Sequence, residues 1–188
     1  SFSYFPFLLY INSMHNKIEL RSIAKSIRKN LNIADISKRI VSNIRDLHEY
    51  HFARHIMLFY PFASEVNLLE LLEDDDKCFY LPRVNGKDLE CCPYKRGNDL
   101  LLSPLNISEP CCEAVDKSEI DLIFTPALMA DSNFYRLGYG GGFYDRFLKN
   151  LNAYKIIPIA EELLIDRLPI ENIDVKCDCI VTQKKASF

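Results

Sequence analysis

With 188 residues, the chain is long enough for one domain that buries roughly two-thirds of the surface its unfolded form exposes. Hydrophobic residues make up 48% and charged residues 26%, a balance that excludes a disordered or fibrous protein. The net charge of -3 argues against a nucleic-acid partner, because binding a phosphodiester backbone requires a large basic surface. A small anionic ligand held by a local cluster of Lys and Arg is compatible with this charge.

The seven cysteines are not spaced as in a structural zinc site. Such sites use cysteines separated by two residues, whereas the close pairs here are adjacent or separated by one: Cys91 and Cys92, Cys111 and Cys112, Cys177 and Cys179. We interpret them as reduced thiols that act as small hydrophobic side chains in core or sheet positions. Reduced cysteines are typical of a cytoplasmic protein, which is the location that we predict.

The amino-terminal stretch SFSYFPFLLYI is apolar, but it is far too short for a membrane span and lacks the basic segment of a secretion signal. It therefore predicts no membrane partner. Met14 precedes a basic helical pattern and resembles a natural start, so we assign residues 1–14 as a leader or a cloning remnant. Residues 15–188 then form a single domain.

Two helices are predicted next. The apolar residues of the first recur at near-helical spacing: Ile18, Ile23, Ile27 and Leu31. This spacing predicts a helix over Lys17–Leu31. Its cations share a neighbouring stripe, for which solvent contact is the default interpretation: Lys17, Arg21, Lys25 and Arg28. Asp35 is a candidate N-cap for a second helix that reaches about Tyr50.

Predicted strands alternate with helices along the rest of the chain. Apolar runs predict them at HIMLFYP, CFYLP, IDLIFTP, YKIIPIA and CDCIVT, of which IDLIFTP is the strongest candidate for a central strand. The pair Asn85-Gly86 predicts a hairpin with one more strand. We expect short helices at VNLLELL and at Phe143–Leu151, and a loop at Pro104–Pro110. The alternation indicates an α/β fold, a single domain of three α/β/α layers with a mainly parallel, mixed sheet.

Four of the six glycines stand in the segment RLGYGGGFYDRFL: Gly138, Gly140, Gly141 and Gly142. The segment follows the predicted central strand and opens a predicted helix, which places its free amides at the carboxyl end of the sheet, where α/β folds bind anions. This position predicts a phosphate-binding loop. The alternative is a tight turn that needs left-handed backbone angles.

The segment matches neither common phosphate motif. No Lys-Ser or Lys-Thr follows the glycines, and Phe143 stands where a dinucleotide-binding loop has its third glycine. Arg136 offers bidentate phosphate recognition. Asp145, in the first helical turn, either complements the helix dipole or holds Mg²⁺ beside a nucleotide. Tyr144 is a candidate for a polar contact, and Phe143 for core packing or contact with a ligand at the rim.

The stretch DLIFTPALMADSNFYRLGYGGGFYDRFL resembles the signature of the 5-formyltetrahydrofolate cyclo-ligases, also called methenyltetrahydrofolate synthetases. This family shows a strand that ends in proline, a short loop and the pattern R-L-G-x-G-x-G-[YF]-Y-D. Weaker matches occur in the family's order, at Lys17–Arg21, Tyr60–Glu65, Leu81–Val84, Asn106–Pro110 and Leu168–Asp174. Together they cover residues 17–182, nearly the whole chain.

The resemblance implies an enzyme that uses ATP and Mg²⁺ to convert 5-formyltetrahydrofolate into 5,10-methenyltetrahydrofolate, with release of ADP and phosphate. The formyl oxygen is phosphorylated, and N10 then attacks the activated carbon. Phosphoryl transfer asks mainly for positioning and charge neutralisation, which cations, free amides and a metal-holding carboxylate supply. We expect a monomer that binds these small molecules and no nucleic acid.

The resemblance also implies residue roles. The ATP contacts are Lys17, Arg21, Arg136, Gly138, Tyr139, Gly140, Gly141, Gly142, Phe143 and Tyr144. The catalytic residues are Arg136, Tyr144 and Asp145, the folate contacts are Tyr60, Glu65 and Phe143, and the Mg²⁺ ligands are Asp145 and Asp174. Structural alternatives stand beside these roles: a solvated stripe for Lys17 and Arg21, strand packing for Tyr60, a helix start for Glu65 and a turn cap for Asp174.

The chain departs from the family pattern at four positions. Ala127 and Ala130 replace the glycine and the aromatic residue common in the loop after the strand, Phe143 replaces the more usual tyrosine, and Ile173 stands where histidine is frequent. These departures favour, as an alternative, a paralogue that binds folate or nucleotide without turnover. A sugar-phosphate isomerase or an acyl-CoA transferase is a third hypothesis, based on fold analogy alone.

Overall fold

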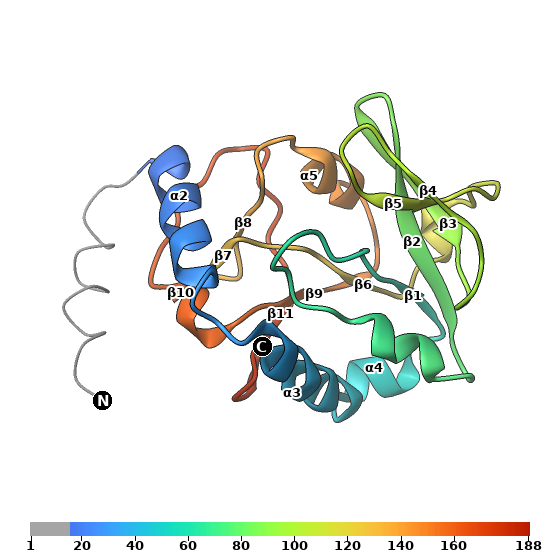
Figure 1. The fold of residues 1–188 in the computed structure, drawn as a ribbon, viewed down its shortest axis with the longest axis horizontal. Coiled ribbons are helices and arrows are strands. Elements are labelled where there is room, and N and C mark those ends of the chain that lie inside the picture. Colours follow the sequence, from blue (N-terminus) through green and yellow to red (C-terminus); the bar gives the residue numbers. More distant parts are fainter. Residues whose placement is uncertain (1–15) are drawn as a thin grey trace.

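The computed structural model describes residues 16–188 (Figure 1). The expectation that residues 1–14 are a leader or a cloning remnant lies outside these described residues. A seven-stranded sheet runs through the molecule in the order β12-β11-β9-β6-β1-β2-β3. β6 (Leu122–Phe124) is its middle strand, as predicted for IDLIFTP. The other strands are β1 (His55–Met57), β2 (Cys78–Asn85), β3 (Asp88–Pro93), β9 (Tyr154–Pro158), β11 (Cys179–Val181) and β12 (Ala186–Ser187).

The sheet is mixed, with a parallel centre. β2, β1, β6, β9 and β11 pair in parallel along the sheet, whereas the edge strands β3 and β12 are antiparallel to their neighbours. β2 and β3 form the predicted hairpin, and Gly86 takes a φ of +62° in its turn. A mainly parallel sheet needs cover on both faces, because the crossover connections place helices there.

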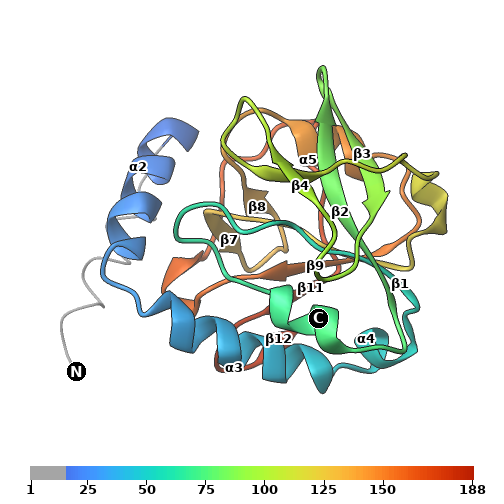
Figure 2. The same ribbon diagram turned by 45° about the vertical axis from the view of Figure 1, so that its right-hand side comes forward.

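Helices cover both faces of the sheet, so the molecule has three layers. α3 (Ile33–Arg45) and α4 (His48–Phe52) lie against one face, and α5 (Phe143–Leu148) lies against the other (Figures 1 and 2). α2 (Lys17–Arg28) lies at one end of the molecule, beside the small sheet described below. The α/β fold with three layers is confirmed.

Side chains alternate between the two faces along the central strands, because successive residues of a strand point in opposite directions. Ile56 and Leu58 enter the larger core under α3 and α4, whereas Met57 enters the smaller core under α5. In β6, Leu122 and Phe124 enter the larger core, and Ile123 packs in the smaller one with Phe147 and Leu148 of α5. Residues of β6 are fully buried, which explains the continuous apolar run in its sequence.

The predicted helix boundaries need correction. α2 ends at Arg28, three residues before Leu31. The second helix is capped by Asn32 and not by Asp35, because the Asn32 side chain accepts a hydrogen bond from the Asp35 amide. It stops at Arg45, and α4 is a separate helix. α5 ends at Leu148 and does not reach Leu151.

Shorter elements also differ from the prediction. The segment VNLLELL forms no α-helix, and its second half belongs to a 3₁₀ helix at Leu69–Glu73. The predicted loop at 104–110 contains β5 (Ser108–Pro110), which pairs with β4 (Leu100–Leu102). A further sheet was not predicted: β10 (Leu164–Ile165), β7 (Met129–Asp131) and β8 (Arg136–Leu137). Two-residue strands carry too little alternation to be read from the sequence.

The cysteines are free thiols, and four are buried as expected: Cys91, Cys92, Cys177 and Cys179. The expectation of a core or sheet position is wrong for Cys111 and Cys112, which are exposed in a loop, and Cys78 is exposed at the start of β2. Burial raises the pKa of Cys91 to about 12, so this thiol stays protonated and inert. No helix within residues 16–188 is both long and apolar enough to span a bilayer.

Candidate functional site

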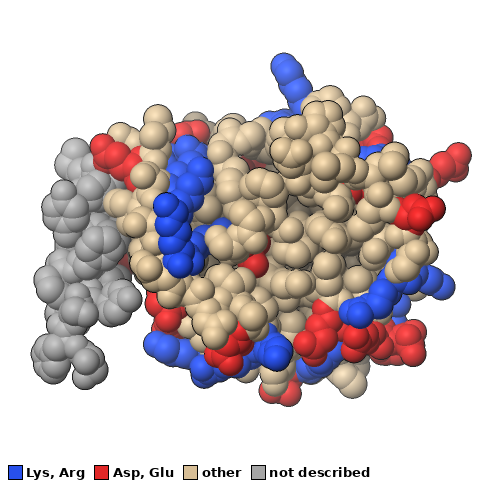
Figure 3. Space-filling view, in the orientation of Figure 1, with Lys and Arg blue, Asp and Glu red and all other residues tan. Residues whose placement is uncertain are grey.

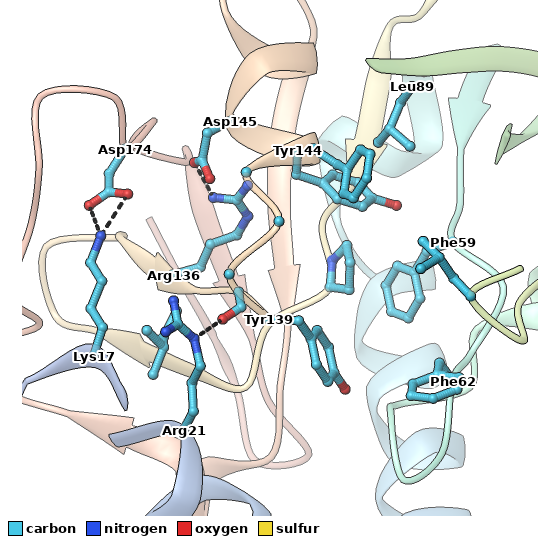
Figure 4. A pocket seen from close by; sticks show the side chains of 18 of the residues that line it. Lys17, Arg21, Phe59, Phe62, Leu89, Arg136, Tyr139, Tyr144, Asp145 and Asp174 are labelled. Carbon is cyan, nitrogen blue, oxygen red and sulfur yellow. Dashed lines mark hydrogen bonds and ion pairs between the residues drawn. The ribbon is translucent and has the colours of Figure 1, made fainter. Parts of the chain in front are cut away.

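A pocket of about 860 Å³ opens at the carboxyl edge of the central strands (Figure 4). Its walls come from the start of α2, the segments after β1 and β6, the hairpin β2–β3 and the glycine segment before α5. Every residue nominated from the sequence lines it: Lys17, Arg21, Tyr60, Glu65, Arg136, Gly138, Tyr139, Gly140, Gly141, Gly142, Phe143, Tyr144, Asp145 and Asp174. The fold thus gathers these side chains from distant parts of the chain.

The glycine segment is both a tight turn and an open wall of the pocket. Gly140 and Gly142 have φ values of +106° and +67°, and Gly142 is the N-cap of α5. The left-handed φ of Gly142 strains any other residue, and a Cβ there would also require the Arg146 guanidinium, 2.7 Å away, to move. A Cβ on Gly138 would meet nothing within 4 Å, so this glycine leaves its part of the wall clear.

Arg136 is a buried cation that pairs with Asp145. Its Nη1 donates to Asp145 Oδ1 at 2.8 Å, and only 3% of its side chain is exposed. Its Nε is buried and has no hydrogen-bond partner within residues 16–188. The guanidinium carbon also lies 5.8 Å from the centre of the Tyr144 ring. Arg136 therefore carries a donor that is available to a further acceptor.

A second pair of opposite charges joins α2 to the loop before β11. Lys17 Nζ lies 2.7 Å from Asp174 Oδ2 and 3.4 Å from Glu171 Oε1. Asp174 Oδ2 also accepts from the Glu171 amide at 2.7 Å, so the turn-cap alternative for Asp174 describes part of its role. Arg21 Nε donates to the Gly138 carbonyl at 2.9 Å, which ties α2 to the glycine segment. Figure 4 shows both carboxylates beside their cations at one end of the pocket.

The donor set at this end suits a hard divalent cation. Asp145 and Asp174 offer carboxylate oxygens, the ligands that Mg²⁺ prefers, and Mg²⁺ usually completes its shell with phosphate oxygens and water. Within the described part of the chain, no three acidic, His or Cys side chains are grouped to hold a metal by themselves. The residues therefore fit an ion that arrives with a nucleotide, and they do not form a metal cage of their own.

The opposite end of the pocket is apolar and aromatic, and Glu65 is its buried acid. Glu65 is 6% exposed, and its Oε2 accepts from the Phe62 amide at 2.8 Å. Burial raises the pKa of Glu65, against the opposing effects of the Phe62 amide, the Tyr139 hydroxyl and the Arg28 guanidinium. The helix-start alternative for Glu65 is wrong, because the next helix begins only at Leu69.

Three of the four aromatic residues nominated from the sequence are Tyr60, Phe143 and Tyr144, and all three line the pocket. The Tyr144 hydroxyl is buried without a hydrogen-bond partner within residues 16–188, and burial raises its pKa. Tyr60 lines the pocket and also packs against the larger core, so strand packing and ligand contact are compatible for it. The Arg146 guanidinium lies over the Phe143 ring, with its carbon 5.2 Å from the ring centre.

Other lining residues were missed from the sequence. They include apolar side chains at the aromatic end and one buried acid: Phe59, Phe62, Leu89, Leu105 and Glu109. Glu109 lies in the segment NISEP, whose family match was noted without a site role, and this match was the only signal. The apolar residues carry no chemical signature, so only the fold identifies them. Figure 3 shows a band of Lys and Arg over α2 beside a largely uncharged surface.

The expectation of solvent contact holds for Lys25, which is exposed, but it is wrong for Arg28. Arg28 is 5% exposed, and its Nη1 donates to the Tyr139 hydroxyl at 3.1 Å. Its Nη2 donates to the Ala127 carbonyl. The last residue of α2 thus reaches behind the pocket wall and holds two segments of that wall.

Sequence comparison places the chain among proteins of folate chemistry. The model of the 5-formyltetrahydrofolate cyclo-ligase family matches residues 14–183. The 5-formyltetrahydrofolate cyclo-ligase of Escherichia coli K12 is 32% identical over 145 residues, which cover 71% of this chain and 80% of the relative. The mouse (Mus musculus) 5-formyltetrahydrofolate cyclo-ligase is 25% identical over 181 residues, 86% of this chain and 87% of the relative.

Solved structures agree with this. The 5,10-methenyltetrahydrofolate synthetase of Aquifex aeolicus superposes with a TM-score of 0.80 at 30% identity, over 90% of this chain and 91% of the other. A synthetase from Mycoplasma pneumoniae, 21% identical, shares the fold with a TM-score of 0.73, over 90% of this chain and 99% of the other. With its glycine segment, paired charges and aromatic pocket end in place, the chain belongs to the 5-formyltetrahydrofolate cyclo-ligase family.

Proposed function

We propose that this protein converts 5-formyltetrahydrofolate into 5,10-methenyltetrahydrofolate at the expense of ATP. One observation carries the proposal: a single pocket holds cations paired with carboxylates at one end and an aromatic wall with the buried acid Glu65 at the other. The charged end has the composition of a nucleotide phosphate site, and the aromatic end suits a flat heterocycle. The two reactants therefore meet inside one cavity.

The reaction needs no nucleophile from the protein. The formyl oxygen attacks the γ-phosphorus of ATP, ADP leaves, and the oxygen now carries the phosphoryl group. N10 then attacks the activated formyl carbon, N10 loses its proton, and phosphate leaves with the former formyl oxygen. The ring closes as the methenyl bridge between N5 and N10. Positioning and charge neutralisation are what such a transfer requires of the protein.

The charged residues supply that neutralisation. Lys17, Arg21 and Arg136 bind the phosphate oxygens, and the free Nε donor of Arg136 supports this role. Asp145 and Asp174 hold Mg²⁺, which when bound with ATP screens the charge of the phosphates. Both carboxylates carry a cation partner in this structure, so nucleotide binding exchanges these ion pairs for contacts to phosphate and metal.

The aromatic end orients the folate. Glu65 accepts hydrogen bonds from the heterocycle, and Tyr60 and Phe143 contact its ring faces. The unpartnered hydroxyl of Tyr144 lies between the two ends, where it donates to the reacting formyl oxygen or to the transferred phosphate. The apolar wall keeps water away from the activated intermediate.

The alternatives are not favoured. One alternative is a paralogue that binds folate or nucleotide without turnover. A pure folate binder needs no paired set of cations and carboxylates, and a pure nucleotide binder needs no aromatic end with a buried acid, whereas this pocket has both. No feature of the pocket supports a sugar-phosphate isomerase or an acyl-CoA transferase.

Steady-state turnover tests the proposal. The protein is mixed with ATP, Mg²⁺ and 5-formyltetrahydrofolate, and methenyl absorbance and phosphate release are followed together. We expect equal amounts of both products, and a loss of about 100-fold or more in kcat/KM for Arg136→Lys and Asp145→Asn. Lys25→Gln removes an exposed cation from α2 and serves as the control. Folate binding without ATP turnover by the wild type would overturn the proposal.

A further inference from the structure

Arg28 is a buried cation without a direct counterion. No ion pair to it occurs within residues 16–188, and its Nε is buried without a hydrogen-bond partner there. Its two terminal nitrogens donate to the Tyr139 hydroxyl and to the Ala127 carbonyl. A buried charge with uncharged partners is costly to the fold, so its presence calls for a reason other than stability. Arg28 itself does not line the pocket.

The hydrogen bonds of Tyr139 connect Arg28 to the pocket. A guanidinium only donates, so the Tyr139 hydroxyl accepts from Arg28 and keeps its own proton to donate elsewhere. The Glu65 carboxylate lies near enough for the Tyr139 hydroxyl to lower its pKa, and both groups line the pocket. The Tyr139 ring is held in turn by an edge contact with Phe62, 6.3 Å between ring centres. Arg28, Tyr139 and Glu65 therefore form a line from the end of α2 to the folate end of the pocket.

The groups that face Glu65 come from each element packed around it. They are Arg28 from α2, Tyr139 from the glycine segment, Tyr144 from α5 and the Phe62 amide from the loop after β1. Arg28 is the only cation in this set. Burial favours the neutral form of Glu65, whereas Arg28, Tyr139 and the Phe62 amide favour the ionised form. A protonated Glu65 loses acceptor capacity toward the N–H groups of a heterocycle.

We propose that Arg28 and Tyr139 are positioning residues that orient Glu65 as an acceptor for the N–H donors of the folate ring. The inference rests on the proposed function and adds to it a control of substrate affinity from behind the pocket wall. Tyr139 stands at a variable position of the glycine pattern, and Arg28 stands outside every motif that the sequence presents. The line is thus a property of this chain's own residues.

Equilibrium binding of 5-formyltetrahydrofolate without ATP tests the inference. Calorimetric titration over about pH 5 to 9 spans the range in which a raised glutamate pKa titrates. The variants are Arg28→Met, Tyr139→Phe and Arg28→Lys, with Lys25→Met as the control that removes an exposed cation from the same helix. We expect Arg28→Met to weaken folate binding about tenfold at pH 7, the loss expected of one charge-assisted hydrogen bond.

The pH dependence separates positioning from a structural role. Ionised Glu65 binds the folate, so wild-type affinity falls as pH decreases through the pKa of this carboxyl. Loss of Arg28 removes a stabilising charge, which moves this fall to higher pH, and Arg28→Lys restores part of the shift. The ATP affinity of the Arg28 variants stays within about twofold of the wild-type value, because the phosphate end of the pocket is intact. Tyr139→Phe keeps the ring contact with Phe62 and leaves Arg28 its bond to the Ala127 carbonyl, so it is a milder change than Arg28→Met and shows a smaller shift in the same direction.

Each result decides the inference. A uniform loss of folate affinity at all pH values, or an equal loss of ATP affinity, would show that Arg28 only supports the wall. If Arg28→Met does not fold, an unshifted pH profile in Tyr139→Phe is sufficient to reject the positioning role. A wild type that binds no folate would overturn the proposed function and this inference with it. If the wild type binds folate and the pH profiles of folate affinity in the variants equal that of the wild type, this inference alone is overturned.

Discussion

At the scale of single residues, the pocket contains charges that the protein has already paired with one another. Arg136 and Asp145 form an ion pair with side-chain exposures of 3% and 19%, and Lys17 pairs with Asp174 at 20% and 13%. Removing one partner of a buried pair leaves an uncompensated charge, which costs more than the pair contributes. These residues therefore affect folding as well as ligand binding.

Asp145→Ala is expected to lower the free energy of unfolding by about 3 kcal/mol, because it strands the Arg136 guanidinium in the protein interior. Urea denaturation followed by circular dichroism measures this. The double variant Arg136→Met with Asp145→Leu is expected to recover most of the loss, since no charge is then left unpaired. Asp88→Ala, at a carboxylate that is 75% exposed, should change stability by less than about 0.5 kcal/mol. Equal stability of Asp145→Ala and wild type would contradict the buried-pair account.

Glu65→Gln is expected to stabilise the fold, and more at pH 7 than at pH 4. Burial raises the folded-state pKa of Glu65 above its ordinary value of 4.5, so folding favours the protonated carboxyl. Below pH 4.5 both states hold the proton, and the full contribution of Glu65 to stability is present. As pH rises through the folded pKa this contribution is lost, because the fold then buries an ionised carboxylate.

Glutamine keeps an acceptor for the Phe62 amide without this penalty. The measurement is urea unfolding of both proteins across the pH range, with Glu113→Gln, at an exposed glutamate, as the control for a lost charge. A gain in stability that is the same at all pH values would contradict the assigned pKa direction. If Glu65→Gln gains stability as expected but loses affinity for folate, the ionisable carboxylate at this position serves binding at a cost in stability.

At the scale of elements, α2 carries three cations to three places. Its first turn presents Lys17 to Asp174, its second presents Arg21 to the glycine segment, and its last residue, Arg28, reaches behind the pocket. The position of the first turn depends on Asn16, whose side chain accepts from the amides of Ile18 and Glu19 at 2.9 and 3.0 Å. The cap therefore connects helix stability to the phosphate end of the pocket.

Asn16→Ala is expected to cost about 1 kcal/mol of stability, the usual cost of a lost N-cap, and to raise the KM for ATP severalfold because Lys17 frays with the first turn. Asn32→Ala removes the cap of α3 at a comparable cost, and its KM for ATP should stay unchanged. Asn16→Ser keeps a capping oxygen and should restore both values. An unchanged KM in Asn16→Ala, with stability lost, would separate the cap from ATP binding.

The elements differ in how far the sequence could predict them. The buried run of β6, the Asn85-Gly86 hairpin and the start of the helix at Lys17 are local patterns, and each was predicted correctly, although the helix ends at Arg28 and not at Leu31. The sheet of β10, β7 and β8 consists of strands of two or three residues, which hydrophobic periodicity cannot distinguish from loop. Asn32 was missed as a cap because Asp35, three residues later, offers the same capping chemistry.

The same contrast holds for the candidate site. Glycines and charged residues within one motif were nominated from the sequence, and the pocket gathers all of them. The burial of Arg28 could not be predicted, since its partners Ala127 and Tyr139 lie 99 and 111 residues away in the chain. A cation on a helical stripe has the same local sequence whether it faces solvent or protein.

At the scale of the whole molecule, the fold brings two chemically different surfaces into one cavity. The parallel strands end at a common edge, α2 closes one side with its cations, and the hairpin β2–β3 closes the other with apolar side chains (Figures 2 and 4). A pocket of about 860 Å³ with this division suits two ligands whose reacting atoms meet in the middle. The proposed function has one consequence for atoms: the formyl oxygen of the folate leaves as part of the released phosphate.

An oxygen-isotope experiment tests this claim most directly. The protein converts 5-formyltetrahydrofolate labelled with ¹⁸O in the formyl group, with unlabelled ATP and Mg²⁺, and mass spectrometry determines the label in the released phosphate. The account predicts one ¹⁸O atom in each phosphate for every methenyl product formed. Unlabelled phosphate beside normal methenyl formation would show that the formyl oxygen leaves by another route, and it would contradict phosphorylation of the folate in this pocket.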